Sequence, residues 1–397
     1  MKKTVILIVI IISLLILGSW MIKTYIGDIR PVFLTPTKKN LIKAPKPKLG
    51  ESLAFPLIVP SDFQIGLFAT NLGQVRDLAF SPGGVLIASV PDNGKVIMMP
   101  DRNKDGIADE TDTIVSGLQK PHGIAFYGNF LYIAEEQNVS RYLWTDQALI
   151  GGIARVEKKL FDLPKGGRHF TRSIVFDSAG KMYVSVGSSC DVCYEKHQFL
   201  GSVIISDSEG IEPKVFAKGL RNSPFITINS LTQELWGTEM GRDFLGDNLP
   251  PDEINIIKSG SNYGWPICYG NKIHDSKFDK NIYADDPCLN SISPAYEIPA
   301  HSAPLGLNFI KSDQFPADWQ NDLLVAYHGS WNRSSPVGYK IVRLHTDNNV
   351  FEEYDFLTGF LSENGAFGRP VDIEFDKSGN LYVSDDKSGS IYIISKK

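Results

Sequence analysis

A histidine and two arginines stand together just ahead of a strand-like run in the middle of the chain. They are Arg168, His169 and Arg172, within GGRHFTRSIVFDSAGKMYVSVGSSCDVC at residues 166–193. An imidazole has an ordinary pKa of about 6.5, so it is largely neutral at pH 7 and can accept a proton. Arginine can donate paired hydrogen bonds to a carboxylate. These residue types, gathered at the mouth of a strand that looks buried, raise the question of what the fold uses them for.

Six copies of one sequence pattern supply the elements that could position these side chains. Each copy has a short apolar run, a polar turn with Gly, Asn, Asp or Ser, and a second alternating run, which is typical of two antiparallel strands. The copies occupy residues 76–89, 122–134, 172–185, 225–238, 305–327 and 371–384. Their spacing leaves room for one four-stranded blade each. Because no long helical period competes, we predict an all-β fold, a six-bladed β-propeller.

In a propeller the first strand of each blade lines a central channel, and the residues just before it lie at one mouth. The polar residues at these positions are Arg76, His122, His169, Arg172, Arg221, Asn222, His301 and Arg369. Several cations at one place repel each other, so this arrangement favours an anionic ligand. A water-filled channel with solvated polar groups is the alternative.

Longer stretches of the chain are similar to one known family. GGRHFTRSIVFDSAGKMYVSVGS, GLRNSPF (219–225), LWGTEMGRDFLGDNLPPDEIN (235–255) and SNYGWP (261–266) together resemble the soluble-type, pyrroloquinoline-quinone-dependent glucose/sorbosone dehydrogenases. PAHSAPLGLNF (299–309) and HGSWNRSSPVGYKIVRL (328–344) resemble its sorbosone-dehydrogenase-like branch. The resemblance begins near Ile58 and continues to the C-terminus. It implies the same six-bladed propeller and the oxidation of a sugar or a sugar-derived aldehyde.

The resemblance implies roles for several residues at the channel mouth. His169 would be the general base that takes a hydroxyl proton while hydride passes to pyrroloquinoline quinone, a flat o-quinone with three carboxylates. The residues that would bind this cofactor are Arg221, Asn222, Arg369, Arg333 and His301. The alternatives are a histidine that only satisfies a strand end and arginines in surface ion pairs.

The resemblance also implies calcium as a second cofactor, a Lewis acid that polarises the quinone carbonyl. Its protein ligands would be the backbone carbonyls of Gly241 and Arg242, although the second position is often proline in the family. Oxygen ligands suit calcium, a hard cation. A second, structural calcium would use Glu253 and the backbone carbonyl of Tyr263, ten residues later. The alternative for Glu253 is the cap of a turn.

A separate acidic loop, DRNKDGIADETD at residues 101–112, has the spacing of a calcium-binding loop. Its candidate ligands are Asp101, Asn103, Asp105 and Asp109. Gly106 also fits, but position 12 is Asp112 instead of glutamate, and no flanking helices are evident. The loop is predicted to connect two strands, and it is either a weak calcium site or a solvated acidic turn.

Two positions depart from the family pattern near the expected substrate pocket. Ser188 stands where an aspartate is frequent, and Arg168 stands where glucose-oxidising members carry an acidic residue. These differences argue against assuming glucose as the substrate. Two rival functions remain, a non-catalytic binding propeller and a calcium-dependent hydrolase of the lactonase type. The hydrolase would need carboxylates and asparagines around an ion in the channel, where this pattern offers arginines and histidines.

The chain has an even number of cysteines, which is typical of disulfides outside the cytoplasm. They are Cys190, Cys193, Cys268 and Cys288. Proximity in the sequence favours the pairs 190–193 and 268–288. A CxxC sequence can also be a redox pair or half of a zinc site, but no second CxxC and no βαβ pattern support these alternatives.

The N-terminal region predicts a membrane anchor and a tether. Residues 4–22 carry no charge and are long enough for about one bilayer crossing. With Lys2 and Lys3 before them, they predict a transmembrane helix at residues 1–23 with its N-terminus inside; a cleaved signal peptide is the alternative. Residues 24–55, rich in proline and lysine, are predicted to be a linker, and residues 56–397 the propeller.

Location, charge and composition restrict the partners. An anchored domain would lie outside the cytoplasm, periplasmic or on the outer face, and would pass electrons to a membrane quinone or a small cytochrome. The net charge is −5, with no broad basic block in the folded part, so nucleic acid is not expected as a partner. With 43% hydrophobic residues, the chain has ample apolar material for a core.

Overall fold

A computed structural model describes residues 13, 53, 56–145, 156–165, 167–347 and 350–397. Apart from the single positions 13 and 53, the predicted anchor and linker at residues 1–55 lie outside the described residues. Within the described part of the chain, no helix has the length and apolar character needed to cross a membrane.

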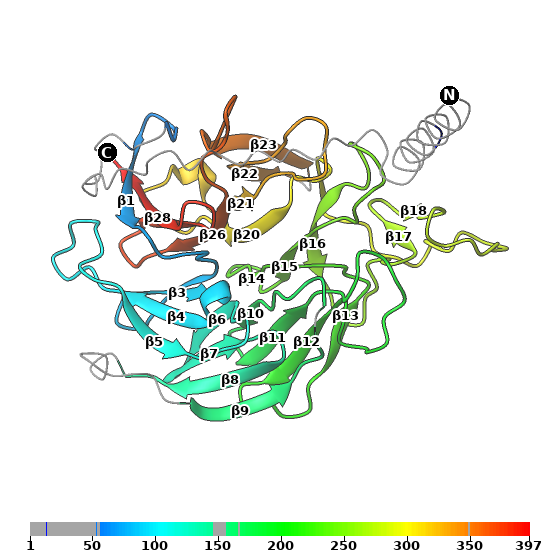
Figure 1. The fold of residues 1–397 in the computed structure, drawn as a ribbon, viewed down its shortest axis with the longest axis horizontal. Helices are drawn as coiled ribbons and strands as arrows, with labels where there is room; N and C mark the ends of the chain where they lie inside the picture. Colours follow the sequence, from blue (N-terminus) through cyan, green and yellow to red (C-terminus); the bar gives the residue numbers. More distant parts are fainter. Residues whose placement is uncertain (1–12, 14–52, 54–55, 146–155, 166, 348–349) are drawn as a thin grey trace, which may run out of the picture.

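Six antiparallel sheets of four strands each are arranged around a common axis (Figure 1). Blade 1 contains β2 (Leu78–Phe80), β3 (Leu86–Val90), β4 (Lys95–Met99) and β5 (Asp112–Ser116). Blade 2 contains β6 (Gly123–Tyr127), β7 (Phe130–Ala134), β8 (Asn138–Leu143) and β9 (Val156–Asp162). Blade 3 contains β10 (Ile174–Phe176), β11 (Lys181–Val186), β12 (Ser202–Asp207) and β13 (Lys214–Lys218).

The remaining blades complete the circle. Blade 4 contains β14 (Ile226–Ile228), β15 (Leu235–Glu239), β16 (Asp252–Ile257) and β19 (Tyr296–Ile298). Blade 5 contains β20 (Pro304–Phe309), β21 (Leu323–Tyr327), β22 (Lys340–Asp347) and β23 (Val350–Leu357). Blade 6 contains β26 (Pro370–Phe375), β27 (Leu381–Asp385), β28 (Ser390–Lys396) and, as its outer strand, β1 (Phe63–Ala69). The predicted six-bladed propeller is therefore confirmed.

Short elements decorate this frame. Two hairpins are formed by β17 (Cys268–Tyr269) with β18 (Ile273–His274), and by β24 (Leu361–Ser362) with β25 (Gly365–Ala366). The described helices beyond position 13 are two short 3₁₀ turns, η1 (Pro91–Asn93) and η2 (Ala317–Trp319). The first hairpin belongs to the long insertion between β16 and β19, next to the blades that carry the candidate site.

The turns between the first two strands of blades 3 and 6 have the same local chemistry. In blade 3, Asp177 accepts hydrogen bonds from the backbone N–H groups of Ala179 and Lys181, and Gly180 adopts φ +77°. In blade 6, Asp376 and Gly379 (φ +86°) form the equivalent turn. Glycine adopts this left-handed conformation without steric cost, so the Asp-x-x-Gly pattern reverses the chain at these points.

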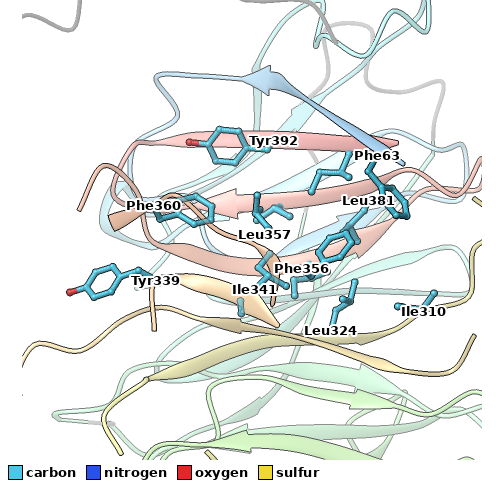
Figure 2. Packing of buried hydrophobic residues seen from close by; sticks show 14 of the residues in the cluster. Phe63, Ile310, Leu324, Tyr339, Ile341, Phe356, Leu357, Phe360, Leu381 and Tyr392 are labelled. Carbon is cyan, nitrogen blue, oxygen red and sulfur yellow. The ribbon is translucent and has the colours of Figure 1, made fainter. Parts of the chain in front are cut away.

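Apolar side chains fill the space between neighbouring blades. Between blades 5 and 6, Phe63, Leu324, Ile341, Phe356 and Leu381 pack together in one buried cluster (Figure 2). They project from five different strands because alternate residues of a strand face the same side of its sheet. Full burial of one such side chain contributes roughly 1.5–3 kcal/mol.

Polar side chains at the starts of the inner strands link each blade to the next. Asp77 accepts a hydrogen bond from the backbone N–H of Ile124 (2.6 Å), and Asp372 accepts one from that of Leu78 (2.7 Å). These residues line an axial cavity of about 300 Å³ that all six inner strands enclose. Burial raises the pKa of Asp372 to about 6, and burial together with Asp372 raises the pKa of Asp77.

Candidate active site

A cavity of about 230 Å³ opens beside the starts of the inner strands, over blades 3, 4 and 5. Its walls come from the loops before β10, β14, β16, β20 and β22. The lining residues are Arg168, His169, Arg221, Met240, Gly241, Asp243, Asp252, His301, Ala303, Trp331 and Asn332. The structure thus brings together four of the predicted site residues, His169, Arg221, Gly241 and His301.

His169 is held in one defined tautomer. Its Nδ1 lies 3.0 Å from the carbonyl oxygen of Ser188 and 2.9 Å from the Ser188 hydroxyl. That hydroxyl donates its own hydrogen to the carbonyl of Cys190 (2.7 Å), so it can only accept from the imidazole. Nδ1 must therefore carry the proton, which leaves Nε2 with its lone pair.

The surroundings of His169 keep its imidazole neutral. Burial and, after it, the positive charges of Arg221 and Arg168 lower the pKa of His169 to about 3. The physical cause is the cost of placing a third positive charge in a desolvated position beside two guanidinium groups. The ring is therefore neutral at pH 7.

Arg221 lines the cavity and is already paired with the carboxylate of Asp191, which lies outside the cavity lining. Its guanidinium donates to the Asp191 carbonyl (2.8 Å) and carboxylate (2.7 Å), and to the Met240 carbonyl (3.1 Å). Asp243 lies 3.8 Å away and also pairs with Arg168. Burial raises the pKa of Asp243 to about 6. The surplus of positive charge that the sequence suggested is thus largely compensated.

Arg172 has a structural position. It is completely buried, and its guanidinium donates to the carbonyls of Glu136, Pro164, His169 and Thr171 at 2.8–3.2 Å. This side chain satisfies the backbone of the loop before β10 and fixes the main chain at His169. It is therefore not among the cations that could face a ligand.

Three predicted cofactor-binding residues lie outside the lining of this cavity. Asn222 accepts a hydrogen bond from Thr171. Arg369 donates to the carbonyls of His328 (3.0 Å) and Gly329 and lies over the ring of Tyr339. Arg333 donates to the carbonyls of Asp247 and Ala300. Each has protein partners where the sequence predicted a cofactor carboxylate, and their binding role stays a prediction.

His301 and two further mouth residues differ in their surroundings. His301 lines the cavity, and its Nε2 lies 2.8 Å from the carbonyl of Gly246. Arg76 forms an ion pair with Asp386 at 2.7 Å. His122 is fully buried, which lowers its pKa, and its Nε2 has no hydrogen-bond partner in the described part of the chain.

The residues predicted for calcium gather at this cavity and at a smaller one beside it. Gly241 lines both, while Arg242, Glu253 and Tyr263 line the smaller cavity of about 30 Å³. Arg242 forms an ion pair with the buried Asp275 (2.7 Å). The Glu253 carboxylate accepts hydrogen bonds from Asn255 and from the backbone of Gly270. Burial raises the pKa of Glu253 to about 6.

The donor set of the larger cavity fits the two groups that the sequence implies. Asp243 and Asp252 contribute buried carboxylates, and the buried Oδ1 of Asn332 has no hydrogen-bond partner among the described residues. Oxygen donors of this kind suit a hard cation. Arg168 and Arg221 add guanidinium groups on the same walls, which suits an organic anion.

The acidic loop at residues 101–112 connects β4 and β5, as predicted. Asp101 accepts hydrogen bonds from the backbone of Asp105 and Gly106, and Asp109 interacts with Arg102. Its aspartates do not converge to metal-ligand distances. Among the described residues, the acidic, histidine and cysteine groups that do converge are Cys190, Cys193 and Glu195. Calcium binding by the loop therefore stays a prediction without geometric support.

Both predicted disulfides form, Cys190–Cys193 and Cys268–Cys288. The first closes a four-residue ring in the loop between β11 and β12. Its sulfurs are therefore not thiolate ligands for a metal. The second anchors the insertion that carries β17 and β18.

Sequence reasoning missed several residues of the cavity. Asp243 and Asp252 lie within the quoted stretch 235–255, and Trp331 and Asn332 lie within SWNR. Asp252 accepts hydrogen bonds from the backbone of Gly241 and Ala303, and burial raises its pKa to about 7. A cluster of acidic residues beside a glycine was the only available signal, and it did not reveal which carboxylates are buried.

Fold and site together define a six-bladed propeller with a histidine in an arginine- and carboxylate-lined cavity at one mouth. The chain belongs to the TrAA12-like family, whose model matches residues 57–397.

Comparison with individual proteins agrees with this assignment. An uncharacterized protein of Borreliella burgdorferi is 31% identical over 359 residues, covering 86% of this chain and 92% of that protein. A pyrroloquinoline quinone-dependent pyranose dehydrogenase of Coprinopsis cinerea is 34% identical over 234 residues, covering 46% and 31%. The calcium structure of the Trichoderma reesei family AA12 enzyme superposes with a TM-score of 0.73 at 20% identity, covering 90% and 100%. The family resemblance seen in the sequence is confirmed.

Proposed function

We propose that this protein is a pyrroloquinoline-quinone-dependent dehydrogenase that oxidises a sugar or a sugar-derived aldehyde. The observation that carries the proposal is the tautomer of His169, a neutral base on the wall of a cavity that also holds two arginines. The dehydrogenase name of the Coprinopsis relative supports the same chemistry. Ser188 and Arg168 remain the reasons not to assume glucose as the substrate, so a sorbosone-type aldehyde is an equal candidate.

His169 performs the proton transfer in this proposal. Its Nε2 takes the proton of the hydroxyl at the carbon that is oxidised, or of the hydrated aldehyde, while Nδ1 stays bonded to Ser188. Arg172 holds the backbone carbonyl of His169 (3.0 Å) and so keeps the ring in place. Pyrroloquinoline quinone, when bound, supplies the hydride acceptor, and calcium supplies Lewis acidity.

Cofactor binding would use the groups that the cavity presents. Arg168 and Arg221 would face the carboxylates of the quinone, and Asp243, Asp252 and the carbonyl of Gly241 would hold calcium. Glu253 and Tyr263 would hold a second, structural calcium in the small cavity. The calcium structure of the Trichoderma enzyme supports a calcium requirement.

We also propose a location outside the cytoplasm, with residues 1–23 as the anchor and a membrane quinone or small cytochrome as electron acceptor. The uncharged segment at residues 4–22 supports the anchor. The two disulfides support an oxidising compartment, since such bonds rarely persist in the cytoplasm.

The structure bears on the lactonase-type alternative. Contrary to the expectation from sequence, the channel does contain carboxylates, because Asp77, Asp372 and Glu374 line the axial cavity. Among the described residues they do not form a cluster of three or more acidic, histidine or cysteine ligand atoms. The hydrolase stays an alternative that the experiment below tests. A binding propeller remains the other alternative for the experiment below.

The test compares wild type with His169→Asn, using His197→Asn as the control because His197 is exposed and outside the cavity. Pyrroloquinoline quinone is titrated in the presence of calcium, and oxidation of aldoses and sorbosone is followed with a dye acceptor. We expect His169→Asn to bind the cofactor within a few-fold of wild type and to lose roughly 10²–10⁴ in kcat. A folded wild type that binds no quinone would support a binding propeller, and cofactor-free lactone hydrolysis would support the hydrolase.

A further inference from the structure

Asp191 lies directly behind Arg221, within the ring that the Cys190–Cys193 disulfide closes. Its backbone carbonyl accepts a hydrogen bond from Arg221 Nε (2.8 Å), and its carboxylate accepts one from Nη2 (2.7 Å). The same carboxylate accepts the backbone N–H of Asp243 (3.0 Å). Asp191 therefore ties a loop of blade 3 to two loops of blade 4.

The neighbouring residues of this ring hold two other cavity residues. The Cys190 carbonyl orients the Ser188 hydroxyl, which receives the hydrogen bond from His169 Nδ1. The Ser189 carbonyl accepts the backbone N–H of Arg168 (3.0 Å). Glu195 in turn accepts hydrogen bonds from the backbone (2.6 Å) and hydroxyl (2.8 Å) of Ser189. Consecutive residues 188–191 thus support His169, Arg168 and Arg221.

The electrostatics explain why Asp191 matters for Arg221. The Arg221 side chain is only 5% exposed, and a buried guanidinium without a counter-charge is strongly destabilising. Although burial opposes ionisation, Arg221 holds the pKa of Asp191 below its ordinary value. A ring of four residues also restricts the backbone of Asp191, so the carboxylate is presented in one position.

We propose that Asp191, held in the Cys190–Cys193 ring, is a positioning residue for the active site. It fixes the orientation of Arg221 in the cavity wall, and opening the ring releases Arg221, Arg168 and His169 together. Asp191 is separate from the cavity lining and acts through Arg221. The consequence for catalysis rests on the proposed function, whereas the consequence for the geometry of His169 does not.

The first experiment compares Asp191→Ala and Asp191→Asn with wild type in two measurements. One is the affinity for pyrroloquinoline quinone with calcium present. The other is the NMR spectrum of ¹³C,¹⁵N-histidine-labelled protein without cofactor. The chain has seven histidines, and the His169 signal is the one that is missing from the spectrum of His169→Asn. The charged groups near the imidazole of His169 are Arg221, Arg168 and Asp191. Asp243 forms ion pairs with both arginines.

For Asp191→Ala we expect a shifted His169 signal and roughly ten- to a hundredfold weaker quinone binding. Losses of this size are typical when a residue that orients a binding group is removed. Asp191→Asn keeps an acceptor for Arg221 and should restore most of both. Asp322→Asn is the matched control, because Asp322 also joins a buried arginine and a histidine, Arg343 and His345, and none of the three lines the cavity. Wild-type affinity and an unmoved His169 signal in Asp191→Ala would overturn the proposal.

The second experiment opens the ring. Dithiothreitol transfers two electrons and two protons to the disulfide, giving two thiols and its own cyclic disulfide. We expect reduced wild type and Cys190→Ser/Cys193→Ser to show the Asp191→Ala behaviour, and the double variant to show no further change with reductant. If the double variant behaves like wild type and still responds to reductant, the response belongs to Cys268–Cys288, and the role of the ring is contradicted.

Circular dichroism and unfolding curves establish that each variant is folded. If Asp191→Ala does not fold, the Cys190→Ser/Cys193→Ser variant still decides the question. If wild type binds no quinone, the proposed function fails while the His169 signal still tests the positioning role.

Discussion

At the scale of single residues, the chemistry depends on what surrounds His169. Ser188 is a neutral hydrogen-bond partner of His169, at the position where the pyrroloquinoline-quinone-dependent sugar dehydrogenases often carry aspartate. A hydroxyl and a carbonyl set the tautomer of His169 without adding a negative charge. Burial and the nearby Arg221 outweigh the hydrogen bond to Ser188 and the charge of Asp191, and they keep the pKa of His169 far below its ordinary value.

Ser188→Asp should raise the pKa of His169 from about 3, because a carboxylate beside Nδ1 stabilises the imidazolium. Histidine NMR over a pH series measures this directly. Ser188→Ala keeps the backbone carbonyl as acceptor and is expected to leave both the tautomer and the low pKa unchanged. A pKa of His169 that does not change in Ser188→Asp would show that burial and the arginines alone determine it.

At the scale of strands and loops, the carboxylates of the inner strands join the blades and also make stability depend on pH. Asp77 and Asp372 accept backbone hydrogen bonds across two successive blade interfaces. Burial raises the pKa of Asp372 from the ordinary 3.8 to about 6. The folded chain thus keeps a proton that the unfolded chain releases. The resulting stabilisation is complete below about pH 4 and is lost as the pH rises through 6.

Asp372→Asn should therefore be more stable than wild type at pH 8 by about 2 kcal/mol, with little difference at pH 4. The asparagine oxygen still accepts from Leu78, and its amide can donate to the Asp77 carboxylate. Urea unfolding curves at both pH values measure the free energy of unfolding. Equal destabilisation of the variant at both pH values would instead indicate that the carboxylate is needed for packing.

At the scale of the whole molecule, the circle of blades is closed by joining the two ends of the described propeller. β1 pairs with β28 from Phe63 opposite Lys396 to Ala69 opposite Ile391 (Figure 1). Phe63 also packs against Phe356 of blade 5 (Figure 2), and against Phe315 of the same blade. The closing strand thus supplies both the outer hydrogen bonds of blade 6 and part of the apolar contact with its neighbour.

Removal of β1, in a chain that starts at residue 71, should lower the melting temperature by roughly 10 °C or more relative to a chain that starts at residue 53. The loss exposes the edge of β28 and the apolar surface around Phe356, so aggregation should increase. Thermal unfolding followed by circular dichroism and light scattering measures both effects. An unchanged melting temperature would mean that the other five blades carry the stability without closure.

Much of this protein was predictable from sequence because the relevant signals are local. The alternating strands and the turn residues between them lie close together in the sequence, so they predict the hairpins and hence the propeller. The same locality applies to the disulfide Cys190–Cys193 and to the place of His169 ahead of an inner strand.

Only the tertiary structure decided which charges meet. Asp191 pairs with Arg221 across 30 residues, Asp243 with Arg168 across 75, and Asp386 with Arg76 across 310. Arg76 and Arg221 were predicted to face an anionic ligand because the sequence shows their positions but not their partners. A guanidinium near a buried cavity needs a counter-charge, and folding supplies that charge from whichever loop reaches it. The sequence alone determined the six blades and the position of His169. Long-range packing determined which charges line the cavity and which are neutralised, because side chains lose their water only where distant segments come together.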